Sequence, residues 1–123
     1  MNALAVLIAT AAIAPPGVYA GSSSAAPSVV MKVRSGTVVE ATAWTSTFNC
    51  ELGGLVGPAQ VTVRPRARVS KSGRISINSG TKTRRLRAKM RFRGGRITGK
   101  IRIVGNIAGP CSSPAVPVTL SRR

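Results

Sequence analysis

Apolar and polar residues alternate most regularly between positions 86 and 103 of this 123-residue chain. Strict alternation is typical of a β-strand that buries one face and exposes the other. The alternation is interrupted at Gly94-Gly95, and two glycines accept the positive φ angles of a two-residue hairpin turn. The pattern therefore predicts a β-hairpin with one apolar and one polar face.

The length of this turn also predicts the register of the hairpin. A two-residue loop would pair the inner residues Phe92 with Ile97, Met90 with Gly99, Ala88 with Ile101 and Leu86 with Ile103. It would pair the outer residues Arg93 with Arg96, Lys89 with Lys100 and Arg87 with Arg102. The apolar residues then share one face, so turn length and side-chain pattern support the same register.

A second alternating stretch, residues 61–69, is followed by Lys71-Ser72-Gly73 and another alternating run. A three-residue loop with Gly73 in the left-handed conformation would pair Val69 with Ile75. Pro65 has no N–H to donate to a ladder, so we expect its strand at a sheet edge or a bulge. The polar face of this predicted second hairpin carries Arg64, Arg66, Arg68 and Arg74.

The chain from Val29 onward is rich in Val, Ile and Thr, with Gly and Pro between the apolar runs. Few stretches show helical periodicity, and this spacing favours an all-β protein. A domain of about 100 residues can hold one modest core. We therefore predict a single small antiparallel β-sandwich or curled meander over residues 29–123.

The first twenty residues are typical of an export signal. An apolar run, Ala3–Ala14, is followed by Pro15-Pro16-Gly17 and then by Val18-Tyr19-Ala20, whose outer residues suit signal peptidase. The sequence predicts a signal peptide, residues 1–20, cleaved after Ala20, and a flexible lead-in, residues 21–28. No Lys or Arg precedes the apolar run, so either the start codon lies upstream or the signal is atypical. A buried N-terminal helix of the mature domain is the alternative.

Cys50 and Cys111 are the two cysteines of the chain. In an exported protein, an even pair of cysteines predicts one disulfide. Two buried free thiols are the alternative. A catalytic thiol is disfavoured, because the chain has no His to activate it.

The charge balance is strongly basic. Nineteen Lys and Arg stand against two acids, Glu40 and Glu51, which gives a formal net charge of +17. Such a balance indicates a polyanionic partner. The alternative is compositional, since GC-rich genomes favour Arg codons, and basic residues scattered over the whole surface would support it.

The outer rows of the two predicted hairpins are the candidate binding surface. Directly opposed like charges destabilise a sheet, and a dense anion laid along them would relieve the repulsion. If the two hairpins share a sheet, they form one basic surface. The predicted polyanion-binding residues are Arg64, Arg66, Arg68, Arg85, Arg87, Lys89, Arg91, Arg93, Arg96, Lys100 and Arg102.

These features predict a secreted or cell-wall-associated, non-enzymatic protein that binds anionic polymers of the cell envelope or matrix by charge density. Nucleic acid is expected to bind only non-specifically, because aromatic residues for base stacking are scarce. A membrane-active, antimicrobial role on anionic lipid is the alternative, and it requires an exposed apolar patch beside the basic face. A plain structural domain of unknown function is a third interpretation.

Enzymatic chemistry is disfavoured by what the chain lacks. The absence of His and Asp excludes Ser-His-Asp and Cys-His arrangements and the usual zinc sites. Glu40 and Glu51 could form a glycosidase pair, but a solvated strand residue and a loop residue explain them better. No catalytic residue, cofactor, metal or specific small-molecule ligand is predicted.

The C-terminal third resembles a diffuse group of small exported β-proteins of actinobacteria and related soil bacteria. The resemblance rests on residues 96–103, RITGKIRI, on Cys111, and on the ending VTLSRR, residues 118–123. Leu120 stands where that group has Trp, and the ending is shorter. The group is uncharacterised, so the resemblance implies export and β structure but no activity.

Overall fold

The computed structural model describes residues 14–22, 28–52, 54–107 and 109–123. Ten β-strands occupy most of these ranges: β1 (Gly17–Ser22), β2 (Ser28–Arg34), β3 (Thr37–Cys50), β4 (Gly54–Val63), β5 (Ala67–Arg68), β6 (Arg74–Gly80), β7 (Arg85–Arg93), β8 (Arg96–Asn106), β9 (Pro110–Ser112) and β10 (Val116–Arg122). The described ranges contain no helix of the length and apolarity needed to cross a membrane. The all-β prediction is confirmed.

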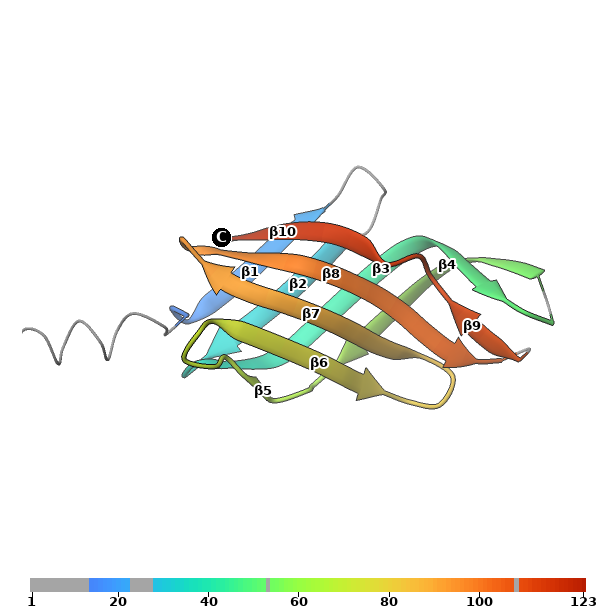
Figure 1. Cartoon of the computed structure of the whole chain (residues 1–123), viewed down its shortest axis with the longest axis horizontal. Helices are drawn as coiled ribbons and strands as arrows, with labels where there is room; N and C mark the ends of the chain where they lie inside the picture. Colours follow the sequence, from blue (N-terminus) through green and yellow to red (C-terminus); the bar gives the residue numbers. More distant parts are fainter. Residues whose placement is uncertain (1–13, 23–27, 53, 108) are drawn as a thin grey trace, which may run out of the picture.

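The strands form one antiparallel sheet that curls into two layers (Figure 1). The front layer holds β10, β8, β7 and β6, and the rear layer holds β1, β2, β3 and β4. The layers are joined where β10 pairs with β1, and where the short β9 pairs with both β3 and β8. The predicted sandwich or curled meander is thus observed as a curled sheet with two facing layers.

The core lies between the layers because each strand turns its apolar row inward. In β7, Leu86, Ala88 and Met90 are buried, while the basic residues between them are exposed. The rear layer contributes large buried side chains such as Met31 and Phe48. Each square ångström of apolar surface removed from water stabilises the fold by about 25 cal/mol. Burial of the apolar inner rows therefore stabilises strands whose outer rows carry like charges.

The hairpin of β7 and β8 has the predicted register. Phe92 pairs with Ile97 and Leu86 with Ile103, and all the predicted pairs between them are present. The turn glycines have φ angles of 60° and 78°. Gly99 is required by close packing, since a Cβ atom there would lie 2.1 Å from the Lys89 carbonyl oxygen.

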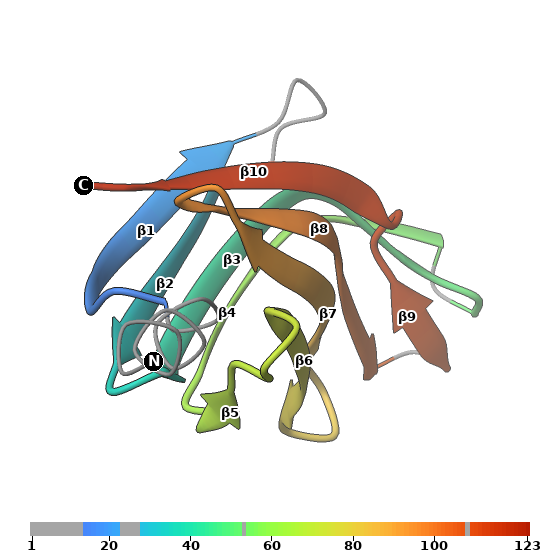
Figure 2. The same ribbon diagram turned by 60° about the vertical axis from the view of Figure 1, so that its left-hand side comes forward.

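The predicted second hairpin is not formed, although its turn is. Gly73 has a φ of 84° and donates its N–H to the Ser70 carbonyl. The strands on either side go to different layers: β4 and β5 pair with β3, and β6 pairs with β7 (Figure 2). The strand before the turn is interrupted, because Pro65 cannot donate to a ladder and Arg66 has a φ of 50°. The predicted Val69–Ile75 pairing is therefore wrong.

The N-terminal described residues are part of the folded body. β1 pairs with β2 along its whole length and with β10 at Tyr19 and Ala20. Tyr19 is fully buried, its ring meets Phe92 edge-on at 6.3 Å between centroids, and its hydroxyl donates to the Pro15 carbonyl at 2.8 Å.

This arrangement bears on the predicted signal peptide and lead-in. The cleavage point predicted after Ala20 falls inside β1, between two residues that pair with β2. Of the predicted lead-in, Gly21 and Ser22 belong to β1 and Ser28 begins β2. Residues 1–13 of the predicted signal and residues 23–27 of the predicted lead-in lie outside the described residues.

The predicted disulfide is confirmed. Cys50, at the end of β3, is bonded to Cys111 in β9, and both residues are buried. The two cysteines also face each other as partners in the β3–β9 ladder. Both cysteines are therefore in the disulfide rather than free thiols.

Candidate anion-binding face

Nine basic side chains share the outer side of β6, β7 and β8, and we call this surface the basic face. It consists of Arg74, Arg85, Arg87, Lys89, Arg91, Arg93, Arg96, Lys100 and Arg102. All are exposed except Arg85, which is half-buried. The alternation places them there, because their neighbours in sequence fill the core.

The pairing of the three strands arranges these side chains in rows across the sheet. One row runs from Arg74 through Arg91 to Thr98. The next runs from Ser76 through Lys89 to Lys100. The third runs from Asn78 through Arg87 to Arg102. Each of these three adjacent rows thus holds a like-charge pair, and the Lys89–Lys100 and Arg87–Arg102 pairs are each flanked on β6 by a neutral polar residue.

The basic face has no acid near it among the described residues. Glu40, on β3 in the rear layer, lies 3.2 Å from the Lys32 ammonium and 3.6 Å from the Arg64 guanidinium. No carboxylate within the described ranges lies within 4.0 Å of a cation of the basic face. Lys32 and Arg64 thus have a carboxylate partner, whereas the cations of the basic face have none among the described residues.

The outer side of the rear layer has a different character. Thr42 and Thr62 face each other there, with their hydroxyl oxygens 2.9 Å apart. Trp44 is half-buried in the neighbouring row, opposite Gln60. Nine of the nineteen basic residues thus share the basic face, and the other ten, among them Lys32 and Arg34 of β2, lie elsewhere on the molecule. The basic face is therefore a local concentration of charge, while the remaining cations are scattered as the compositional interpretation expects.

The structure separates three predicted site residues from the others. Arg64 and Arg66 follow β4, and Arg68 in β5 pairs with Thr37 of the rear layer. Arg68 thus lies beside β3, whereas Arg74 of β6 lies opposite Arg91 of β7. Arg74 is therefore the one arginine of the predicted second hairpin in the ladders of the basic face, and the binding role of Arg64, Arg66 and Arg68 stays a prediction.

Arg85 differs from the other members of the basic face. Its guanidinium donates to the Asn78 side-chain oxygen at 3.2 Å, to the Asn78 carbonyl at 3.1 Å and to the Gly80 carbonyl at 3.2 Å. It thus fastens β7 to the end of β6. Its donors are largely occupied, so it contributes charge more than new contacts.

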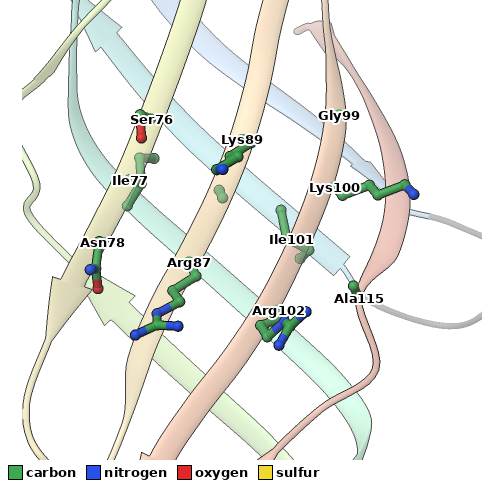
Figure 3. Close-up of a pocket in the computed structure, with 11 residues that line it drawn as sticks. Ser76, Ile77, Asn78, Arg87, Lys89, Gly99, Lys100, Ile101, Arg102 and Ala115 are labelled. Carbon is green, nitrogen blue, oxygen red and sulfur yellow. The ribbon is translucent and has the colours of Figure 1, made fainter.

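A hollow of about 630 Å³ lies over the Lys89–Lys100 and Arg87–Arg102 pairs (Figure 3). Its lining comes from β6, β7, β8 and the residue before β10: Ser76, Ile77, Asn78, Arg87, Ala88, Lys89, Gly99, Lys100, Ile101, Arg102 and Ala115. Ser76 and Asn78 border it on the β6 side, and Ala115 borders it on the β10 side. No aromatic side chain lines it. The hollow is an open, cationic site with neutral hydrogen-bonding groups at one edge.

Catalytic or metal-binding groups do not gather in the described part of the chain. No three of its His, Cys, Asp or Glu residues lie close enough to hold a metal ion. Glu40 is engaged with two cations, and Glu51 follows β3. The sequence-based expectation of a non-enzymatic protein stays a prediction.

No protein-family model, curated protein or solved structure matches this chain. The geometry and charge of the basic face are therefore the features that point to a function.

Proposed function

We propose that this is an exported, non-enzymatic protein that binds anionic polymers of the cell envelope or extracellular matrix through its basic face. The observation that carries the proposal is the pairing of Lys89 with Lys100 beside Arg87 with Arg102, without a neighbouring carboxylate among the described residues. Opposed like charges on a sheet cost stability, and a bound polyanion relieves that cost.

The spacing of the charges suits an extended polyanion. Side chains on one face of a strand repeat about every 6.6 Å. This distance is shorter than the Debye length of about 8 Å at physiological salt, so neighbouring cations act together. Arginine also binds two oxygens of a carboxylate, sulfate or phosphate with its planar guanidinium group. A polymer with closely spaced anionic groups can therefore contact several rows at once.

Nucleic acid fits this surface only through its phosphates. Proteins that bind single strands stack bases on exposed aromatic rings. Phe92 is half-buried against Tyr19, and Trp44 lies on the rear layer. The basic face thus supplies charge to a nucleic acid but no stacking platform, and binding without sequence preference is expected.

Export is supported by one structural observation and by one expectation from the sequence. The Cys50–Cys111 disulfide is compatible with an oxidising compartment outside the cytoplasm. The resemblance of the C-terminal third to small exported β-proteins points the same way. A basic protein in that location meets acidic wall or matrix polymers, so a secreted or wall-associated location follows from the proposal.

A membrane-active role is the second candidate, and two side chains favour it. Leu52 and Ile107 are 83% and 52% exposed, and both follow strands at the disulfide end of the molecule. Among the residues whose burial the structure describes, they are the exposed large apolar ones, and neither lies on the basic face. Insertion of an L52S/I107S variant into anionic vesicles should be weaker than that of wild type if this role is correct.

Two variants of equal net charge test the proposed function. The face variant carries Ser at Arg87, Lys89, Arg91, Lys100 and Arg102. The control variant carries Ser at five exposed cations outside the basic face, namely Arg34, Lys71, Lys82, Arg122 and Arg123. Binding to purified bacterial cell wall and to immobilised heparin is measured for both, with melting curves to verify folding.

We expect the face variant to lose binding and the control variant to keep most of it. Binding should also weaken steeply as salt rises from about 50 to 500 mM, because screening shortens the range of each charge. Equal losses in the two variants would show that net charge, and not the basic face, determines binding. Absence of binding by wild type at low salt would overturn the proposal.

A further inference from the structure

The hollow over β6, β7 and β8 combines two kinds of group. Arg87, Lys89, Lys100 and Arg102 supply four exposed cations. At its β6 edge stand two neutral polar side chains, Ser76 and Asn78. Charge density alone would not require neutral donors and acceptors beside the cations. Their position suggests a ligand that is both anionic and rich in hydroxyl groups.

The polar groups at this edge have hydrogen-bonding capacity left. The Ser76 hydroxyl makes no hydrogen bond to another described residue. The Asn78 side-chain oxygen accepts from Arg85, which leaves the amide NH₂ group to donate outward. One hydroxyl and one amide thus stand next to the cations, within the same rows of the sheet.

Building on the proposed function, we propose that the hollow is a subsite for one unit of an acidic polysaccharide. The anionic group of the sugar unit accepts hydrogen bonds from Arg87, Lys89, Lys100 or Arg102. Hydroxyl groups of the same unit bond to Ser76 and Asn78. The absence of aromatic side chains from the lining disfavours a nucleobase in this position, because bases are held by stacking.

Comparing the binding of two carboxylate polymers distinguishes recognition of charge from recognition of hydroxyl groups. Oligogalacturonate carries a carboxylate and free hydroxyls on each unit, whereas oligoglutamate of equal charge carries the carboxylates without hydroxyls. Dissociation constants for both are measured by calorimetry at one low salt concentration, with a thymidine oligonucleotide of equal charge as a third probe. We expect wild type to prefer oligogalacturonate about tenfold, since two added hydrogen bonds contribute roughly this much.

A neutral double substitution tests the role of the β6 edge. In S76A/N78A the net charge is unchanged, and Arg85 keeps its two backbone acceptors, the carbonyls of Asn78 and Gly80. The matched control is T98V/T119V, which removes two exposed hydroxyls from the front layer outside the hollow. The preference for oligogalacturonate should disappear in S76A/N78A and persist in T98V/T119V.

The outcomes distinguish this inference from the proposed function. If wild type binds all three probes equally and in a salt-dependent manner, the basic face binds polyanions but the sugar subsite is overturned. A preference that survives in S76A/N78A, or a preference for the oligonucleotide, overturns the subsite as well. If wild type binds none of the probes, the proposed function fails and the subsite fails with it.

Discussion

Lys89 lies directly opposite Lys100 in the β7–β8 ladder, and no described carboxylate lies within 4.0 Å of either ammonium group. The adjacent row repeats the arrangement with Arg87 and Arg102. Such pairs destabilise a sheet. The buried row beneath them, which includes Leu86 and Ile103, compensates by removing apolar surface from water.

Removal of one like-charge pair should stabilise the protein while weakening its binding. We expect K89T/K100T to raise the free energy of unfolding by about 0.2–1 kcal/mol at low salt, because the opposed charges are gone and Thr suits a strand. Urea denaturation measures this gain, which should shrink in 500 mM salt as screening weakens the repulsion in wild type. A double variant less stable than wild type at low salt would contradict this reading of the pair.

The disulfide should account for a large share of the stability. Cys50 and Cys111 are 61 positions apart, and closing a loop of this length is worth about 4 kcal/mol in the chain-entropy model. C50A/C111A should therefore unfold at much lower urea concentration than the oxidised wild type. Reduced wild type is the matched control and should behave like the double variant. A decrease of less than about 1 kcal/mol in the free energy of unfolding would show that the disulfide restricts the unfolded chain only slightly.

Residues 14–20 should be needed for folding. A chain that begins at Gly21 lacks Tyr19, which is fully buried against Phe92, and it lacks most of β1. Loss of one large buried aromatic side chain typically costs about 3–5 kcal/mol, which is much of the stability of a small domain. We expect this chain to unfold non-cooperatively, whereas a chain that begins at Ala14 melts in one transition.

The same comparison bears on processing of the N-terminus. Equal melting of the two chains would agree with cleavage after Ala20 and would contradict the contribution of β1 to the fold. If only the chain that begins at Gly21 fails to melt cooperatively, the folded protein retains residues 14–20.

Stability should fall in strongly basic solution because of Tyr19. Burial raises the pKa of its phenol above the ordinary value of 10.0, and the nearby Arg122 offsets this rise in part. The folded state therefore holds the phenolic proton more tightly than the unfolded state, and this contribution to stability is complete below about pH 10. As pH rises from there through the higher pKa of the folded state, the unfolded state loses its proton first and stability declines.

The Y19F variant isolates this effect from the titration of lysines. The decline above pH 10 should be smaller in Y19F than in wild type, as measured by urea denaturation at a series of pH values. Parallel curves for the two proteins would show that Tyr19 does not have a raised pKa in the folded state.

Local patterns predicted the parts of the fold that local interactions determine. The β7–β8 hairpin follows from Gly94-Gly95 and from strict alternation, which together leave one register. The same alternation indicated which side chains point outward. An even pair of cysteines in a chain expected to be exported predicted the Cys50–Cys111 disulfide.

These patterns could not predict which strands pair when they lie far apart in the sequence. Residues 61–69 alternate well, but alternation does not specify a partner strand, and β4 and β5 pair with β3 instead of β6. Arg68 therefore lies beside β3, and Arg64 and Arg66 lie between β4 and β5, outside the ladders of β6, β7 and β8. An apolar N-terminal segment is equally compatible with a signal and with a buried strand, so the role of β1 emerged only from its pairing with β2 and β10. The hollow depends on the same non-local arrangement.

The central claim is that one face of the molecule binds anionic polymer, and an NMR titration of the full chain with a heparin oligosaccharide tests it most directly. The claim predicts that amide shifts concentrate on β6, β7 and β8, including Ser76, Lys89 and Lys100, while Thr42 and Thr62 on the rear layer stay unchanged. Shifts spread evenly over both layers, or centred on the rear layer, would contradict it.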